Sequence, residues 1–178
     1  MGEQNWLELL NSQTWLKQVQ ETNQYTEKFG LELSEKDAEL LFVEKNNTLK
    51  AERRVEFGQS ILPQTIYAFC DSSFISQENY VETLIWLQEI FYLYKNEIYD
   101  EITDDELINF MKEQFDTVCY GDLDYLEGPC LDIFAQAIRA GYRGYQETQG
   151  FGEFEKFDIV VRWDKSLYLE ALSELCWR

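Results

Sequence analysis

Two consecutive helical patterns between residues 76 and 118 constrain the fold of this chain more than any other feature. Residues 76–94 form its most apolar helical run, with apolar side chains on more than one face. A helix that is apolar nearly all round is usually buried in the middle of a bundle. Residues 103–118 form an amphipathic pattern that buries one face. We therefore predict two antiparallel helices, at 76–94 and 103–118, on which the other helices pack.

Capping residues mark the starts of these helices. Ser76 is a candidate N-cap, and Thr103 with Glu106 has the form of a capping box. Ser34 is a further N-cap, with Asp37 at the third helical position. Other helices are expected at residues 5–29 (with a break near 11–12 as an option), 34–57, 60–70, 131–140 and 166–177, with Asp122 capping a loop or short helix.

These patterns predict a mainly α-helical, single-domain bundle of six or seven helices over residues 1–178. Residues 1–30 would be an N-terminal helical extension, 31–145 the helical core, and 146–178 a loop followed by a C-terminal helix. The β-branched run within residues 154–163 could be a strand, so a small β element near the C-terminus is an option.

The net charge limits the classes of partner. The chain has 15 Lys and Arg against 34 Asp and Glu, a net charge of -19. Binding to nucleic acid requires basic patches that neutralise phosphates, so direct nucleic-acid binding and an anionic membrane surface are both disfavoured. A basic protein surface is the partner that this charge would attract, although acidity by itself also keeps a protein in solution.

Much of the acidity is concentrated in residues 97–132, which contain twelve carboxylates and a single cation, Lys112. Three interpretations remain open. The carboxylates could form a face that binds a basic, even a nucleic-acid-binding, protein by imitating phosphate charge. Two or three of them could bind a divalent metal, although Asp122 and Asp124 are not followed by a calcium-loop pattern. They could also only cap helices and solvate an exposed edge.

We favour the first interpretation, a non-enzymatic interaction protein without cofactor or metal. Its candidate partner-binding residues are Asp100, Glu101, Asp104, Asp105, Glu106, Asp122, Asp124 and Glu127. The alternatives are a carboxylate-based, metal-dependent enzyme and a homo-oligomeric structural protein. The chain has no histidine, which excludes Ser-His-Asp and Cys-His catalysis, and no phosphate-binding loop.

The four cysteines and the basic doublet have structural explanations. No CxxC pair exists, and Cys70 and Cys119 lie among apolar residues, as buried thiols do. Without an N-terminal signal pattern, we expect a cytoplasmic protein.

The only basic doublet of the chain is Arg53 and Arg54. These two residues are expected to pair with Glu52, Glu56 or the acidic joint at residues 97–101.

Four segments together resemble a known family: residues 61–71 (ILPQTIYAFCD), 74–80 (FISQENY), 102–107 (ITDDEL) and 121–125 (GDLDY). They are similar to an uncharacterised family of proteins from low-GC Gram-positive bacteria. The similarity covers about residues 31–145. It implies a bacterial cytoplasmic origin, and it carries neither an activity nor a functional residue.

Overall fold

The computed structural model describes residues 2–56 and 60–141. These residues form helices and no strand, which confirms the predicted all-α fold. The longer helices are α1 (Gly2–Thr26), α2 (Glu35–Ala51), α3 (Ile61–Phe69), α4 (Tyr80–Glu97), α5 (Asp104–Thr117) and α7 (Leu131–Arg139). Shorter elements are η1 (Glu27–Phe29), α6 (Leu123–Tyr125) and η2 (Leu126–Cys130). The predicted β element at 154–163 and the helix at 166–177 lie outside the described residues.

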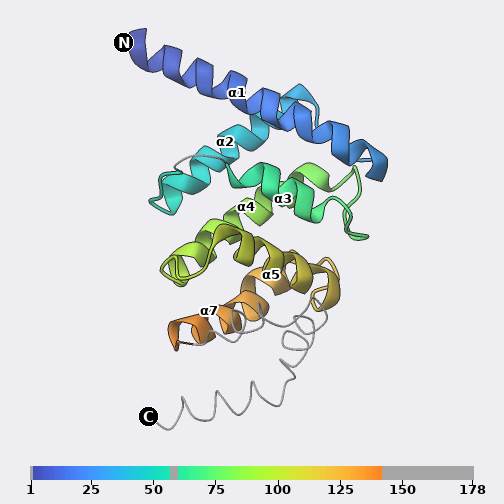
Figure 1. Ribbon diagram of the computed structural model, residues 1–178, viewed down its shortest axis with the longest axis vertical. Coiled ribbons are helices and arrows are strands. Elements are labelled where there is room, and N and C mark those ends of the chain that lie inside the picture. The colour runs from blue at the N-terminus through green and yellow to red at the C-terminus, as the bar shows by residue number, and fades with distance from the viewer. Residues whose placement is uncertain (1, 57–59, 142–178) are drawn as a thin grey trace. The chain divides into compact units, whose positions relative to one another are not determined.

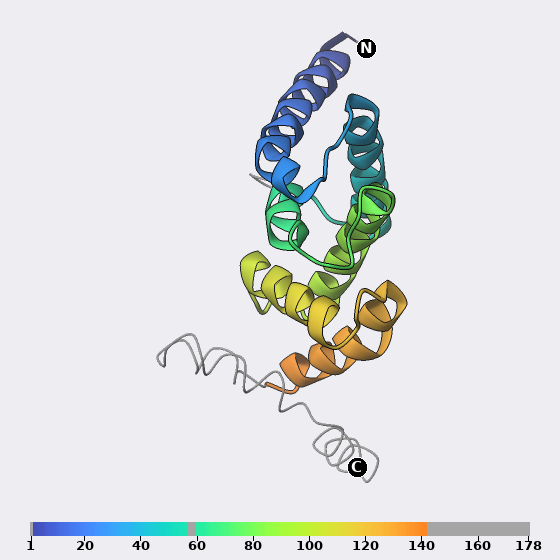
Figure 2. The same ribbon diagram turned by 90° about the vertical axis from the view of Figure 1, so that its right-hand side faces the viewer.

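The contacts divide the chain into two compact units, residues 1–132 and residues 133–178. In the first unit α1 packs on α2 and α3, α2 packs on α4, and α3 also contacts α4 and α5. Both views show α3 between α1 and α5 (Figures 1 and 2). The N-terminal helix therefore belongs to the same unit as α2 to α5.

The core of the first unit lies around α3 and α4. The side chains of Leu62, Ile66, Leu84 and Leu87 are fully buried there. Phe69 of α3 meets Phe115 of α5 edge-on, with ring centroids 5.6 Å apart. The prediction that α4 and α5 form the central antiparallel pair is therefore corrected, because α5 packs chiefly on α3 and η2.

Local capping explains why several helices begin where they do. The amide of Asp37 donates to Ser34 Oγ (3.2 Å) and the amide of Ser34 donates to Asp37 Oδ2 (2.9 Å). Thr103 and Glu106 form the same reciprocal pair at the start of α5, at 2.8 and 3.3 Å. Both capping boxes agree with the sequence prediction, and each N-cap is worth about 1 kcal/mol.

Two predicted boundaries are wrong. Helix α4 begins at Tyr80 and not at Ser76, because the Asn79 side chain closes a preceding turn by accepting from the Ser76 amide (2.9 Å). Helix α2 ends at Ala51 and not at residue 57. There Arg53 adopts a left-handed conformation (φ 54°), and the Arg54 amide donates back to the Leu49 carbonyl (2.8 Å). This is the Schellman ending of a helix, which usually requires glycine.

Among residues 2–56 and 60–141, no helix is both long and apolar enough to cross a membrane.

Candidate functional site

Residues 98–103, which connect α4 to α5, form a tight turn whose outer side is polar. This turn is called the joint below. Tyr99 and Asp100 are both left-handed (φ 53° and 55°), and the Asp100 amide donates to the Lys95 carbonyl at 3.0 Å. Ile98 and Ile102 are buried on the inner side, whereas Tyr99 is 76% exposed. The two buried isoleucines thus anchor the joint, and Tyr99 and Asp100 project outward between them.

Lys95 is the buried cation beneath this joint. Its ammonium group lies 2.7 Å from the Ile102 carbonyl oxygen, 2.9 Å from Asp104 and 3.5 Å from Asp100. A buried ammonium group is tolerated only when its donors are satisfied, and here three oxygens surround it. Lys95 therefore draws the end of α4 and the start of α5 together.

Arg54 is a second cation that holds the joint. Its guanidinium group donates to both carboxylate oxygens of Asp100, at 2.7 and 3.2 Å, and to Asn96 Oδ1 at 2.8 Å. This hydrogen-bonded pair lowers the pKa of Asp100 and raises that of Arg54. The predicted pairing of the basic doublet with the acidic joint is confirmed for Arg54, while Arg53 is exposed.

Two side chains of α4, Tyr92 and Asn96, lie one helical turn apart and bind the segment that follows α2. Asn96 donates to both the carbonyl and the carboxylate of Glu52, at 3.0 and 2.8 Å. The Tyr92 hydroxyl donates to Glu56 (2.7 Å), which also accepts from Lys45 (2.7 Å). Burial, and then the bond to Glu56, raise the pKa of Tyr92. The sequence analysis missed this network because it placed Glu56 inside the preceding helix.

The structure gives defined contacts to several of the eight candidate residues. Asp100 and Asp104 come together around Lys95. Glu106 completes the capping box, and Asp122 caps α6 by accepting from the Tyr125 amide at 3.0 Å. Glu127 accepts from Trp86 Nε1 at 2.6 Å, and its carbonyl accepts from the Tyr94 hydroxyl. Glu101, Asp105 and Asp124 are exposed, and Glu101 also has an interaction partner within the chain.

Several cations of the first unit turn inward while their carboxylate partners face solvent. The side chains of Lys45, Arg54, Lys95 and Lys112 are each at most 22% exposed. Three of their partners, Asp71, Asp100 and Asp104, are at least half exposed, whereas Glu56, the partner of Lys45, is only 13% exposed. At these three pairs the carboxylate therefore faces solvent more than the cation does.

Two hollows of the first unit also bear on its chemistry. The larger, about 740 Å³, is lined by Trp15, Lys45, Lys50, Arg54 and Glu56 among others. Two of its three cations already pair with carboxylates, Lys45 with Glu56 and Arg54 with Asp100. Most of the charged side chains that line this hollow are therefore already paired with an opposite charge.

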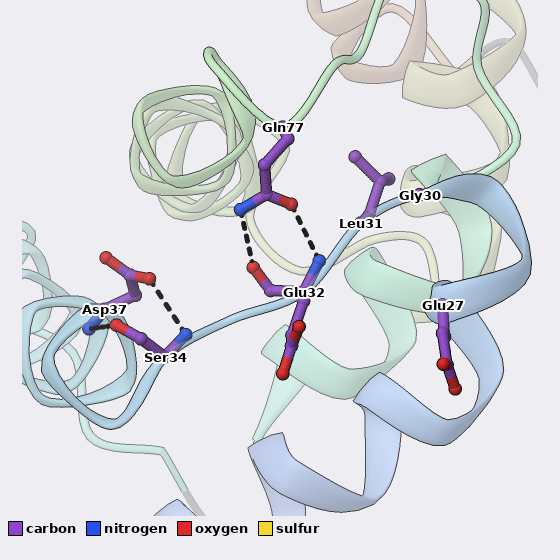
Figure 3. Close-up of a pocket in the computed structure, with 7 residues that line it drawn as sticks. All are labelled: Glu27, Gly30, Leu31, Glu32, Ser34, Asp37 and Gln77. Atoms are coloured by element: carbon purple, nitrogen blue, oxygen red, sulfur yellow. Dashed lines mark hydrogen bonds between the residues drawn. The ribbon is translucent and has the colours of Figure 1, made fainter.

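The smaller hollow, about 490 Å³, lies beside the connector between η1 and α2 (Figure 3). The Gln77 amide exchanges two 2.8 Å hydrogen bonds with the backbone of Glu32. The carboxyl groups of Glu27, Glu32 and Asp37 point apart and not toward one centre (Figure 3). Consistently, no three Asp, Glu or Cys side chains in the described part of the chain form a group that could hold a metal ion.

The described residues define an all-α protein, and the chain carries a net charge of -19. A model described as a family of unknown function (DUF6323) matches residues 18–144, and the chain belongs to this family. The match confirms the resemblance drawn from residues 61–125; a bacterial origin stays a prediction. No curated protein and no solved structure matches the chain.

Proposed function

We propose that this chain is a non-enzymatic interaction protein that binds a basic protein surface. The binding region comprises two groups of carboxylates, which together we call the acidic surface. Asp100, Glu101, Asp104, Asp105 and Glu106 lie at the joint and the start of α5, and Asp122, Asp124 and Glu127 lie at α6 and η2. The observation that carries the proposal is the inward orientation of the cations, which leaves their partner carboxylates facing solvent. Such a surface steers a cationic partner into encounter and disfavours an anionic one.

Rigid placement of two carboxylates supports the same proposal. Asp100 and Asp104 are fixed by Arg54 and Lys95, yet about half of each side chain faces solvent. A partner that binds them loses little additional side-chain entropy, because they are already ordered. Fixed carboxylates can also occupy a groove that otherwise receives phosphates, so a nucleic-acid-binding protein is the favoured class of partner.

The test is an affinity capture from the source cell with matched charge-reversal variants. The site variant is Glu101→Lys, Asp105→Lys and Asp124→Lys, which leaves the Arg54 and Lys95 ion pairs intact. The control variant is Glu27→Lys, Glu32→Lys and Glu39→Lys, with exposed carboxylates at and near η1 and α2. Both variants change the net charge equally, so total charge alone cannot separate them.

We expect a basic protein to be retained by the wild type at low salt and lost at high salt, since salt screens exposed charges. The site variant should lose it at low salt and the control should keep it. Added nucleic acid should compete with the chain for this partner. Equal retention by both variants, or equal loss, would contradict the proposal, provided that both melt cooperatively.

A further inference from the structure

The larger hollow of the first unit is lined by one face of α1 and one face of α2. From α1 it receives Thr14, Trp15 and Gln18. Its lining residues from α2 recur every three or four positions and so share one face of that helix: Phe42, Lys45, Asn46, Leu49 and Lys50. Its volume, about 740 Å³, lies in the range of small-molecule sites, about 300–1,000 Å³.

The charges around this hollow reverse the balance of the whole chain. Three cations and one carboxylate line it, whereas the chain has 15 Lys and Arg against 34 Asp and Glu. Glu56 balances Lys45, and Asp100 balances Arg54. Among residues 2–56 and 60–141, the ammonium group of Lys50 has no hydrogen-bond or ion-pair partner. Within the described chain, the positive charge of Lys50 is therefore available to a negatively charged ligand.

Neutral donors lie beside this charge. Gln18 and Asn46 also line the hollow, and within the part of the chain that the structure describes neither side-chain amide has a hydrogen-bond partner. Asn46 precedes Lys50 by one helical turn, so both side chains project from the same face of α2. Carboxylate and sulfonate oxygens accept hydrogen bonds from amide and ammonium N–H groups. The hollow thus combines one unbalanced positive charge with neutral donors.

The wall also offers ordered apolar surface. Phe42 packs against the buried ring of Trp15, with centroids 5.7 Å apart. Lys45 is only 8% exposed, and its ammonium group lies 4.4 Å from the centroid of the Trp15 ring. Val55, in contrast, is 71% exposed. Because burial of apolar surface is favourable, an apolar group that covers Val55 and Phe42 would bind there.

We propose that this hollow is a binding site for a small organic anion, a molecule with one carboxylate or sulfonate group on an apolar body. The negative group pairs with Lys50 and accepts hydrogen bonds from Gln18 and Asn46. The apolar body covers Phe42 and Val55. A single negative charge matches the single unbalanced cation of the described lining, and the net charge of -19 repels a polyanion.

This site goes beyond the proposed function and does not rest on it. Gln18, Asn46 and Lys50 belong to α1 and α2, whereas the acidic surface belongs to the joint, α5, α6 and η2. The two proposals also require ligands of opposite charge. Either one can therefore fail while the other stands.

The experiment titrates the folded full chain with two fluorescent probes that share an apolar body. Anilinonaphthalene sulfonate carries one negative charge, and phenylnaphthylamine has the same body without the sulfonate. We expect the anionic probe to bind at one saturable site, and more tightly than the neutral probe. Added salt should weaken the binding of the anionic probe alone, because salt screens the attraction to an exposed cation.

Substitutions assign the binding to the hollow. Lys50→Gln should weaken the anionic probe roughly threefold, as the loss of one exposed ion pair does, and leave the neutral probe unchanged. Lys36→Gln is the matched control, since Lys36 is also exposed on α2 and its loss changes the net charge equally. Lys50→Arg should keep the affinity, and Val55→Ser should weaken both probes.

Three results would overturn the proposal. The first is the absence of saturable binding of the anionic probe to the wild type. The second is equal affinity of the wild type for both probes, which would show that the hollow does not recognise an anion. The third is an equal effect of Lys50→Gln and Lys36→Gln, which would show that only total charge matters. The first two results come from the wild-type chain, so they do not depend on the folding of any variant.

Discussion

Arg54 forms a bidentate ion pair with Asp100, a residue 46 positions later in the chain. The pair joins the segment after α2 to the turn after α4. It also stabilises a turn in which Tyr99 and Asp100 both adopt a left-handed conformation, which is unfavourable for residues other than glycine. The shape of the acidic joint therefore depends on a basic residue from a distant part of the sequence.

Arg54→Ala should destabilise the fold by about 1–2 kcal/mol near neutral pH, because it removes a partly exposed ion pair and a hydrogen bond to Asn96. The pKa of Asp100 is lowered in the folded state, so this stabilisation is present above the unfolded pKa of about 4 and is lost as pH falls below it. Urea unfolding of the wild type and of Arg54→Ala measures the difference in their free energies of unfolding. The difference should shrink at about pH 3, and a constant difference would contradict the ion-pair explanation.

Lys95→Met should cost more, about 3 kcal/mol, because it leaves the Ile102 carbonyl and two carboxylates without their shared buried cation. Lys17→Met is the matched control, since Lys17 is 79% exposed and forms only a 4.0 Å pair with Glu21. The control should change the free energy of unfolding by less than about 0.5 kcal/mol. Similar losses in both variants would show that the buried position of Lys95 has no special importance.

Comparing Gly121→Ala with Gly30→Ala separates the stability cost of a left-handed backbone from the cost of a steric clash. Both glycines are left-handed, but only Gly121 has an atom within 4 Å of the added Cβ, namely in Phe74. Gly30→Ala should cost about 1 kcal/mol from the conformation alone. Gly121→Ala should cost about 1–3 kcal/mol more because of overpacking. In thermal unfolding, Phe74→Gly, which removes Cβ as well as the ring, should recover part of the additional loss, and full additivity would exclude a clash with the Phe74 side chain.

Alkaline pH should destabilise the protein through Tyr92 and Tyr94. Burial raises the pKa of both, with further contributions from Glu56 at Tyr92 and from nearby acids at Tyr94. The unfolded chain then loses these protons first, so stability is complete below about pH 10 and declines above it.

Urea unfolding as a function of pH tests this decline. Tyr92→Phe should flatten the dependence above about pH 10, whereas Tyr99→Phe, at an exposed site, should not. An identical slope in wild type and Tyr92→Phe would refute the assignment to Tyr92.

Capping boxes and periodicity were sufficient to predict the starts of α2 and α5, since Ser34 with Asp37 and Thr103 with Glu106 act within one turn of helix. The same method misplaced the end of α2. No glycine marks that end. Arg53 is the left-handed residue there, and the Arg54 side chain that follows it is held by Asn96 of α4 and by Asp100 of the joint.

The candidate site, like the fold, was predicted from the sequence only in part. The sequence located the acidic residues, because charge is a property of composition. It did not distinguish Asp100 and Asp104, which Lys95 fixes in place, from Asp105, which is exposed.

The amino-acid sequence by itself thus determined the helical class, the acidic charge and the starts of α2 and α5, because these arise from residues within a few positions of one another. Only the tertiary structure decided that Arg54 meets Asp100 and that Lys95 lies beneath the joint. These contacts depend on how helices distant in sequence pack, and packing is a collective property of the core that no local pattern encodes.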